Sequence, residues 1–232
     1  MPRTARASVG GYCYHVLNRG NARREVFRKE QDYHAFVKLI RQASARLPMR
    51  LLGFCLMPNH FHLALWPYGD DDLSAWMGWL LTAHVRRYHK HYHSSGHVWQ
   101  GRFRAFPIQE DAHLLAVLRY IERNPLRANL VAKAEDWTWS SLRYRLEAPL
   151  LPFIEPSPVP LGPDWRGHVN EAQTEEEVKR LRHCIDRGMP YGSDDWTKQT
   201  AVSLGLESSL RPRGRPRKSA DEPDEDGATL FG

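Results

Sequence analysis

The sequence predicts an α+β fold, a ferredoxin-like antiparallel sheet with helices, followed by a C-terminal helical extension. Three observations lead to this fold. Apolar patterning alternates as strand, helix, strand, strand, helix and strand; only Pro58-Asn59 separates the second and third strands; and the composition changes after residue 145. A link of two residues implies an antiparallel hairpin, and this element order is that of a ferredoxin-like sandwich.

The first half of the chain supplies three strands and one helix. Residues 11–18 are rich in aromatic and branched side chains and end in a turn, so they predict the first strand. Residues 32–45 have apolar side chains at helical spacing and predict a helix. Residues 50–57 and 60–66 form the hairpin, and the alternation in its second strand is typical of a half-buried strand.

Two further helices frame the fourth strand. Asp70-Asp71-Asp72 offers N-terminal caps for a long helix with an apolar stripe. Residues 102–109 alternate as a strand, with Phe103 and Ala105 on one face. Asp111 opens the next helix, which Pro125 ends or bends.

The charge is distributed unevenly along the chain. Residues 1–145 contain 22 Lys and Arg against 11 Asp and Glu, whereas residues 146–210 contain 6 against 11. A basic first domain is expected of a nucleic-acid-binding protein, with a merely soluble basic protein as the alternative. The three cysteines have no C-x-x-C spacing, and no apolar run is long enough to span a bilayer, so we expect a soluble cytosolic protein without a membrane partner.

His60 and His62 lie two residues apart in the third strand and therefore share a face. Neutral imidazoles are common metal ligands, and a strand fixes their spacing, so the pair can bind one divalent cation. A chance H-x-H in a chain with 12 histidines is the alternative.

Tyr120 and Asn124 lie one helical turn apart beside the apolar stripe of the helix that begins at Asp111. A basic line runs beside them and consists of Arg119, Arg123 and Arg127. Alone, a tyrosine flanked by arginines indicates amphipathic edge packing. Together with the histidine pair, it indicates metal ligands, a phenol nucleophile and phosphate-binding arginines in one chain.

The loop at residues 89–101 interleaves aromatic and basic side chains, which offer stacking surfaces and charge to a nucleic acid. The alternatives are a loop that is only solvated and a second metal site on its histidines, which the absence of a fixed strand or helix spacing disfavours. We assign four residues in and around this loop and the strand ends to nucleic-acid binding: Trp99, Arg19, Arg102 and Arg104.

These motifs carry a resemblance to a known family. They are His60-Phe61-His62 within residues 57–63, then residues 98–103 and residues 120–128. The chain resembles the single-tyrosine HUH transposases, and more narrowly the REP-associated tyrosine transposases of bacteria. Residues 137–141 and 211–218 are also similar to that subgroup, so only the acidic end, from about Asp221, has no counterpart.

The resemblance implies an HUH endonuclease fold for residues 1–145 and a metal-dependent enzyme that cleaves and rejoins hairpin-forming, REP-like single-stranded DNA. By this analogy His60 and His62 bind Mg²⁺ or Mn²⁺, and Tyr120 is the nucleophile that forms a 5′-phosphotyrosine. Asn124 occupies the place of a third metal ligand, or it caps a helix that starts at Pro125. The implied location is the bacterial cytoplasm, at the nucleoid; we expect a monomer, with a dimer as the alternative.

The rest of the chain is expected to support this domain. Residues 146–210 read as a proline-rich crossing followed by helices, one of them opened by a Thr174/Glu177 capping box. Residues 211–232 read as a disordered tail, first basic and then acidic. Its basic part is similar to an AT-hook, with DNA contacts from Arg213, Arg215 and Arg217; a simple electrostatic tether is the alternative.

Two other functions compete with the strand transferase. One is a protein derived from a transposase that binds hairpin repeats without cutting them. The other is an unrelated metal-dependent hydrolase built on the H-x-H pair, which the basic domain and the lack of further Asp or Glu ligands disfavour. A metal-dependent covalent adduct with single-stranded DNA separates the first reading from both.

Overall fold

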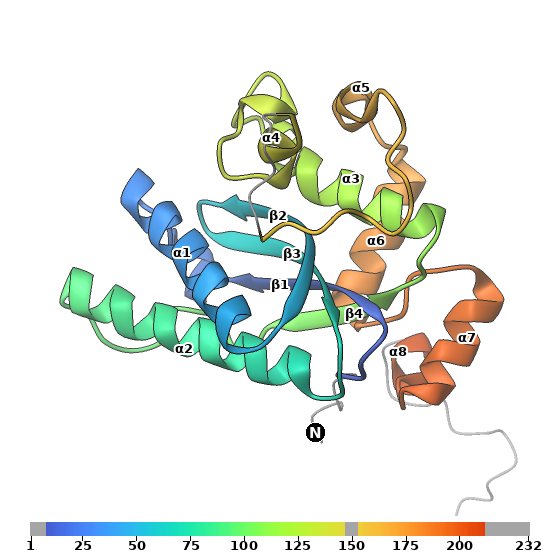
Figure 1. Cartoon of the computed structure of the whole chain (residues 1–232), viewed down its shortest axis with the longest axis horizontal. Helices are drawn as coiled ribbons and strands as arrows, with labels where there is room; N and C mark the ends of the chain where they lie inside the picture. The colour runs from blue at the N-terminus through green and yellow to red at the C-terminus, as the bar shows by residue number, and fades with distance from the viewer. Residues whose placement is uncertain (1–7, 147–152, 212–232) are drawn as a thin grey trace, which may run out of the picture.

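The computed structural model describes residues 8–146 and 153–211, which form an α+β fold around a four-stranded antiparallel sheet (Figure 1). The sheet order is β2-β3-β1-β4, with β1 (Cys13–Arg19), β2 (Met49–Met57), β3 (His60–Pro67) and β4 (Arg104–Ile108). Helix α1 (Glu30–Arg46) connects β1 to β2, and α2 (Asp72–Tyr92) connects β3 to β4. This is the predicted ferredoxin-like arrangement.

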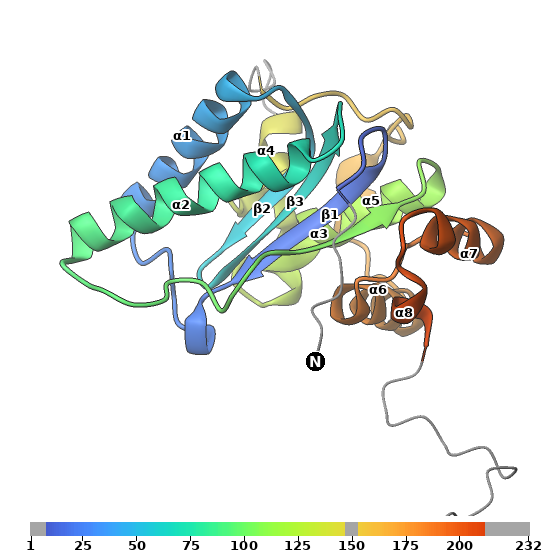
Figure 2. The ribbon, with the colours of Figure 1, turned by 90° about the horizontal axis from the view of Figure 1, so that it is seen from below.

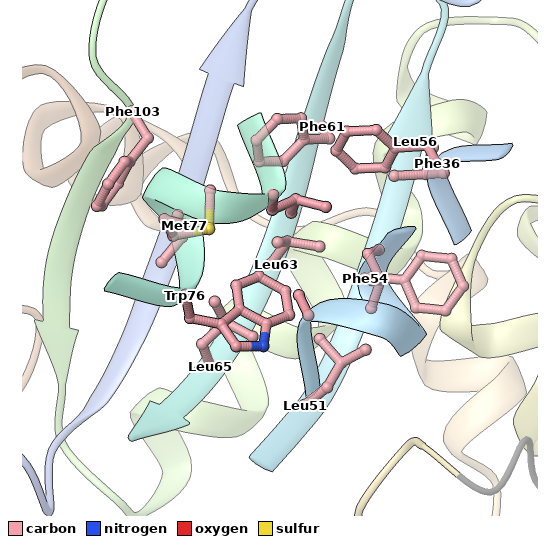
Figure 3. Close-up of a cluster of buried hydrophobic side chains, with 14 of the residues drawn as sticks. Phe36, Leu51, Phe54, Leu56, Phe61, Leu63, Leu65, Trp76, Met77 and Phe103 are labelled. Atoms are coloured by element: carbon pink, nitrogen blue, oxygen red, sulfur yellow. The ribbon is translucent and has the colours of Figure 1, made fainter. Parts of the chain in front are cut away.

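Both faces of the sheet are covered, which corrects the expectation of a half-buried third strand. Helices α1 and α2 cover one face, and α3 (Ala112–Arg127) lies against the other (Figures 1 and 2). The alternation of β3 sends Phe61, Leu63 and Leu65 into the core beneath α1 and α2. Figure 3 shows this core, to which α2 contributes Trp76 and Met77. The histidine pair therefore points into the layer between the sheet and α3.

Helix α3 approaches the sheet closely because β2 has a glycine beneath it. The β2–β3 register shifts between Leu51 and Gly53, and a Cβ at Gly53 would lie only 2.8 Å from Cδ2 of Leu118. A side chain there would force the Leu118 side chain to move and would crowd Oγ of Ser141 at 3.2 Å. Gly53 thus helps to set the distance between the sheet and the helix that carries Tyr120.

The helix ends differ in part from expectation. Asp111 caps α3 as predicted, since its carboxylate accepts a hydrogen bond from the His113 backbone N–H. Asp71 is the N-cap of α2 but has a left-handed backbone (φ 63°) and makes no side-chain cap bond, so the predicted carboxylate cap is wrong. The Asp72 carboxylate instead accepts from the Gly69 N–H at 2.7 Å. Pro125 lies inside α3, which ends two residues later.

The C-terminal extension is helical, as predicted. The predicted helices correspond to α6 (Glu175–Arg187), which has the Thr174/Glu177 capping box, and α7 (Asp194–Ser203). The unpredicted helices are short, namely α4 (Ser141–Leu146), α5 (Trp165–Asn170) and α8 (Glu207–Leu210), with 3-10 turns η1 (Asn21–Arg23) and η2 (Ala134–Asp136).

The extension packs against the β4 edge of the sheet (Figures 1 and 2). Tyr191 forms a parallel bridge with Ile108, and its backbone N–H donates to the Pro107 carbonyl at 2.9 Å. This contact covers part of an edge that would otherwise leave its backbone groups unpaired. Among the described residues, we find no helix whose length and apolar character would let it span a bilayer.

Candidate active site

His60 and His62 lie on the α3 side of β3, at the start of this strand, where it pairs with the end of β1. Arg19 stands directly opposite His60 on β1, and Leu17 stands opposite His62. The two imidazole centroids are 5.0 Å apart, and the ring planes are 85° apart. The strand period therefore brings the two rings together as predicted, in a layer that excludes most water.

Both histidines are neutral near neutral pH. Burial lowers the pKa of His60 from 6.5 to about 4, with further lowering by the positive charges of Arg19 and Arg127. Burial also holds the pKa of His62 well below its usual range, followed by the neighbouring imidazoles and the same two arginines. Neutral rings keep the nitrogen lone pair that metal binding requires.

The hydrogen bonds of the two rings leave the same nitrogen free on each. Nδ1 of His60 lies 2.6 Å from Oδ1 of Asn59, an acceptor, so this nitrogen carries the proton. Nδ1 of His62 lies 2.8 Å from Nε2 of His15. Nε2 of each ring is the nitrogen left for a ligand, and an outer hydrogen bond that orients a ligating histidine is a usual feature of metal sites.

Tyr120 reaches this pair from α3. Its ring centroid is 5.9 Å from that of His62, with the planes 89° apart, and 6.2 Å from that of His15. The residue is only 4 % exposed, so most of its ring is covered by the surrounding protein. The guanidinium of Arg127 lies 4.2 Å from the ring centroid, so a fixed positive charge stands beside the phenol.

Asn124 lies one turn beyond Tyr120, with its amide buried. Its Nδ2 donates to the Tyr120 carbonyl at 2.9 Å, and its Oδ1 accepts from Arg127 at 2.5 Å. Because α3 runs on through Pro125, no helix starts there, and the alternative of an N-cap is wrong. An amide oxygen has two lone pairs, so Oδ1 keeps one acceptor site beside the bond to Arg127.

The chemistry of these groups fits a divalent cation. Two imidazole nitrogens and one amide oxygen are neutral donors, so a bound cation would keep its full charge for an anionic substrate. Within residues 8–146 and 153–211, no cluster of three or more His, Cys, Asp or Glu side chains is arranged to hold a metal. A third protein ligand would therefore be a neutral donor such as Asn124.

A polar groove of about 470 Å³ opens beside this site, at the ends of β1 and β4. It brings together three arginines that the sequence assigned to nucleic-acid binding, and it adds one more; the four are Arg19, Arg23, Arg102 and Arg104. Asp186 of α6 also lines it and pairs with Arg104 at 3.2 Å. The concentration of guanidinium groups makes this groove suited to phosphates.

Three of the predicted nucleic-acid contacts lie elsewhere. Trp99 is buried among Phe27, Phe36 and Phe61, so its ring is core rather than a free stacking surface. Arg119 donates to the carbonyls of Glu171 and Ala172, and Arg123 donates to those of Val169 and Asn170, at the end of α5. Both arginines therefore attach α5 to α3.

Helix geometry explains why the basic line divides. Each residue turns the helix by about 100°, so Arg119 and Arg127 differ by roughly 80° around the axis. Arg127, seven residues after Tyr120, returns to within about 20° of it, whereas Arg119 points roughly 100° away. Arg127 therefore lies nearest to the tyrosine face, and Arg123, roughly 60° away, is held by the carbonyls at the end of α5. Arg213, Arg215 and Arg217 lie outside the described residues.

Sequence reasoning missed two buried polar groups near the site. His15 in β1 is fully buried beside His62. Glu122 of α3 is fully buried as well, and it accepts hydrogen bonds from Ser141, Arg145 and Trp165. The available signal was a polar residue inside an apolar strand or a helix stripe, because such groups are buried only when they have partners.

Comparison with known proteins agrees with this geometry. Residues 8–124, about half of the chain, match the family described as IS200-like transposases. A protein of Haemophilus influenzae described as a REP-associated tyrosine transposase is 29 % identical over 133 residues, which cover 52 % of this chain and 75 % of that protein.

A solved structure of a REP-associated tyrosine transposase bound to a REP hairpin shares the fold. Its TM-score is 0.53 at 20 % identity, covering 75 % of this chain and 100 % of that one. The match over half of the chain, on a fold that brings a histidine pair and a helical tyrosine together, identifies the protein as a member of the IS200-like transposase family.

Proposed function

We propose that this protein is a metal-dependent endonuclease and strand transferase that cleaves and rejoins hairpin-forming single-stranded DNA through a 5′-phosphotyrosine intermediate. The observation that carries the proposal is the contact of Tyr120 with His62, which forms a pair of neutral histidines with His60; Nε2 of each ring makes no hydrogen bond. Membership of the IS200-like transposase family supports it. We assign this chemistry to residues 1–145, with residues 146–210 as an accessory segment.

In this proposal His60 and His62 hold Mg²⁺ or Mn²⁺, with Asn124 as the third protein ligand. When bound, the cation supplies positive charge to the non-bridging oxygens of the scissile phosphate. Arg127, 4.2 Å from the Tyr120 ring centroid, adds a second positive charge where negative charge develops on the phosphate. The buried layer between β3 and α3 excludes water, which strengthens both interactions.

The cleavage step forms one bond and breaks one. The Tyr120 oxygen loses its proton and attacks the phosphorus, while the bond from phosphorus to the 3′-oxygen breaks and that oxygen gains a proton. The products are a phosphotyrosine ester on the 5′ side and a free 3′-hydroxyl. Attack by another 3′-hydroxyl reverses the step and joins two strands, since the phosphotyrosine ester retains most of the energy of the broken phosphodiester bond.

The DNA reaches this site along the arginine groove. Arg19 connects the two features, because it lines the groove and also stands opposite His60 in the sheet. The relative in the solved structure was bound to a REP hairpin. A hairpin with a single-stranded flank is accordingly the substrate we propose here, with phosphate contacts from Arg23, Arg102 and Arg104.

The test is a Tyr120→Phe variant incubated with a labelled hairpin oligonucleotide and Mg²⁺ or Mn²⁺. Only an oxygen is removed, so the variant should bind the hairpin like the wild type but form no denaturant-stable protein–DNA adduct and release no 3′-hydroxyl fragment. Tyr88→Phe is the matched control, because Tyr88 is a buried tyrosine of α2 on the other side of the sheet. It should keep full adduct formation.

The outcomes separate the competing functions. An adduct that survives Tyr120→Phe would show that the nucleophile is another residue. If the wild type forms no adduct on any hairpin but still binds it, the protein is a non-catalytic hairpin-binding protein. His60→Ala and His62→Ala should abolish cleavage while binding persists, and EDTA should act in the same way on the wild type.

A further inference from the structure

His15 is a histidine of β1 that contacts the metal-binding pair from within the protein. Its side chain is fully buried, and its Nε2 lies 2.8 Å from Nδ1 of His62. The two rings stack with centroids 5.0 Å apart and planes 15° apart, and the Phe106 ring packs edge-on against His15 at 5.0 Å. This packing leaves the His15 ring little freedom to move away.

A hydrogen bond between two neutral imidazoles has two arrangements of its proton. If Nε2 of His15 donates, the only proton of His62 resides on its own Nε2, and that nitrogen has no lone pair for a cation. If Nδ1 of His62 donates to Nε2 of His15, Nε2 of His62 keeps its lone pair. The proton position on this bond therefore decides whether His62 can be a ligand.

We infer that His15 is a positioning residue that accepts the Nδ1 proton of His62 and thereby directs the lone pair of His62 toward the bound cation. The inference rests on the proposed metal site. Nδ1 of His15 has no hydrogen-bond partner among the described residues. No second bond consequently fixes the tautomer of His15, and its Nε2 is available as an acceptor.

His60 is oriented in the same way, by an acceptor at its Nδ1, but here the acceptor cannot change its role. Its Nδ1 faces the amide oxygen of Asn59 at 2.6 Å, which can only accept. The two ligands of the pair are thus oriented by different groups, one by a loop amide and one by a buried histidine. Loss of His15 should affect His62 and leave the orientation of His60 intact.

The first experiment measures Mn²⁺ affinity from the EPR signal of the free ion, on the full-length protein without DNA. His15→Leu replaces the imidazole by an apolar side chain of similar bulk that has no hydrogen-bond acceptor. This variant should bind Mn²⁺ roughly 10- to 100-fold more weakly than the wild type. His15→Gln supplies an amide oxygen and should bind within about threefold of the wild type. His84→Leu is the matched control, because His84 is another buried histidine, with an unpartnered Nδ1, on α2.

The second experiment reads the tautomer directly. Imidazole ¹⁵N NMR of the wild type with saturating Mg²⁺ should give His62 as the Nδ1-protonated form, and the same form should be lost or mixed in His15→Leu. Urea unfolding of each variant reports on the fold. If His15→Leu loses metal affinity and the selected tautomer of His62 but keeps the urea midpoint of the wild type, His15 positions His62 and does not merely stabilise the fold.

His62→Ala tests the proposed metal site separately from the proposed role of His15. If His62→Ala binds Mn²⁺ like the wild type, the proposed metal site is wrong. If His62→Ala loses binding but His15→Leu does not, or if His15→Gln loses as much as His15→Leu, the site stands and the role of His15 is wrong. A wild-type His62 protonated on Nε2 in the presence of Mg²⁺ would also overturn it.

Discussion

Replacement of Glu122 by glutamine should cost the protein several kcal/mol of stability, although the side chain keeps its shape. The carboxylate is fully buried and accepts from Arg145 Nε at 2.8 Å, Ser141 Oγ at 2.5 Å and Trp165 Nε1 at 2.7 Å. Arg145 is itself only 8 % exposed at its side chain. These contacts attach α4 and α5 to the helix that carries Tyr120.

The magnitude follows from what glutamine leaves behind. Its amide nitrogen is a donor, so at least one of the three donors loses its acceptor, and the Arg145 guanidinium loses its counter-charge in a buried place. Breaking a buried ion pair from one side costs about 3–5 kcal/mol, and glutamine should fall near the lower end because its oxygen still accepts. For a chain of this length that corresponds to a Tm lower by roughly 6–12 °C.

Urea unfolding followed by circular dichroism, together with calorimetry, measures the change. Glu171→Gln is the matched control: Glu171 also pairs with an arginine of α3, Arg119, but at 3.9 Å and with 72 % of its side chain exposed. An exposed pair contributes about 1 kcal/mol or less. If Glu122→Gln lowers the free energy of unfolding no more than Glu171→Gln does, the hydrogen bonds of Glu122 do not hold α4 and α5 on α3, which would refute this prediction.

Three further predictions concern the site, the groove and pH. Arg127→Ala should lower single-turnover cleavage by roughly a hundredfold with a much smaller loss of hairpin affinity, because it removes charge beside the nucleophile; Arg46→Ala on α1 should change neither. Asp186→Asn should raise hairpin affinity in a filter-binding assay, since it frees Arg104 from an acidic neighbour; unchanged affinity would exclude this part of the groove. Burial lowers the pKa of His84 from 6.5 to about 3, so the unfolded chain binds the proton first and stability falls as pH drops from 6.5 toward 3. Between pH 6 and 4, the free energy of unfolding of His84→Leu, measured in urea, should change with pH by about 1.4 kcal/mol per pH unit less than that of the wild type. An unchanged dependence on pH would contradict a lowered pKa of His84.

The fold could be predicted because its signals are local. Strand and helix periods, a hairpin link of two residues and the Thr174/Glu177 capping box depend on neighbours in the chain. The predicted elements are present in the structure, with ends that differ by a few residues. The short helices α4 and α5 were not predicted, because each is only 6 residues long and depends on tertiary contacts, those of α5 with α3 and those of α4 with β2 and η2.

The candidate site was predictable where one element supplies the pattern. His60 and His62 follow the strand period, and Tyr120 and Asn124 follow the helix period. Contacts between distant segments were not predictable from spacing. Trp99 reads as a surface aromatic in a basic loop, yet three phenylalanines from other elements surround it.

The burial of β3 on both faces has a direct consequence for the chemistry. A half-exposed imidazole titrates near 6.5 and would lose its lone pair to a proton in mildly acidic solution. Burial lowers the pKa of His60 to about 4 and holds the pKa of His62 well below its usual range, so both rings stay neutral. Helix α3 is therefore more than the carrier of Tyr120: by covering the sheet, it desolvates the pair and keeps the nitrogens in the form that a cation requires. A change that loosens α3, such as the loss of Glu122, should weaken the metal site and the nucleophile together.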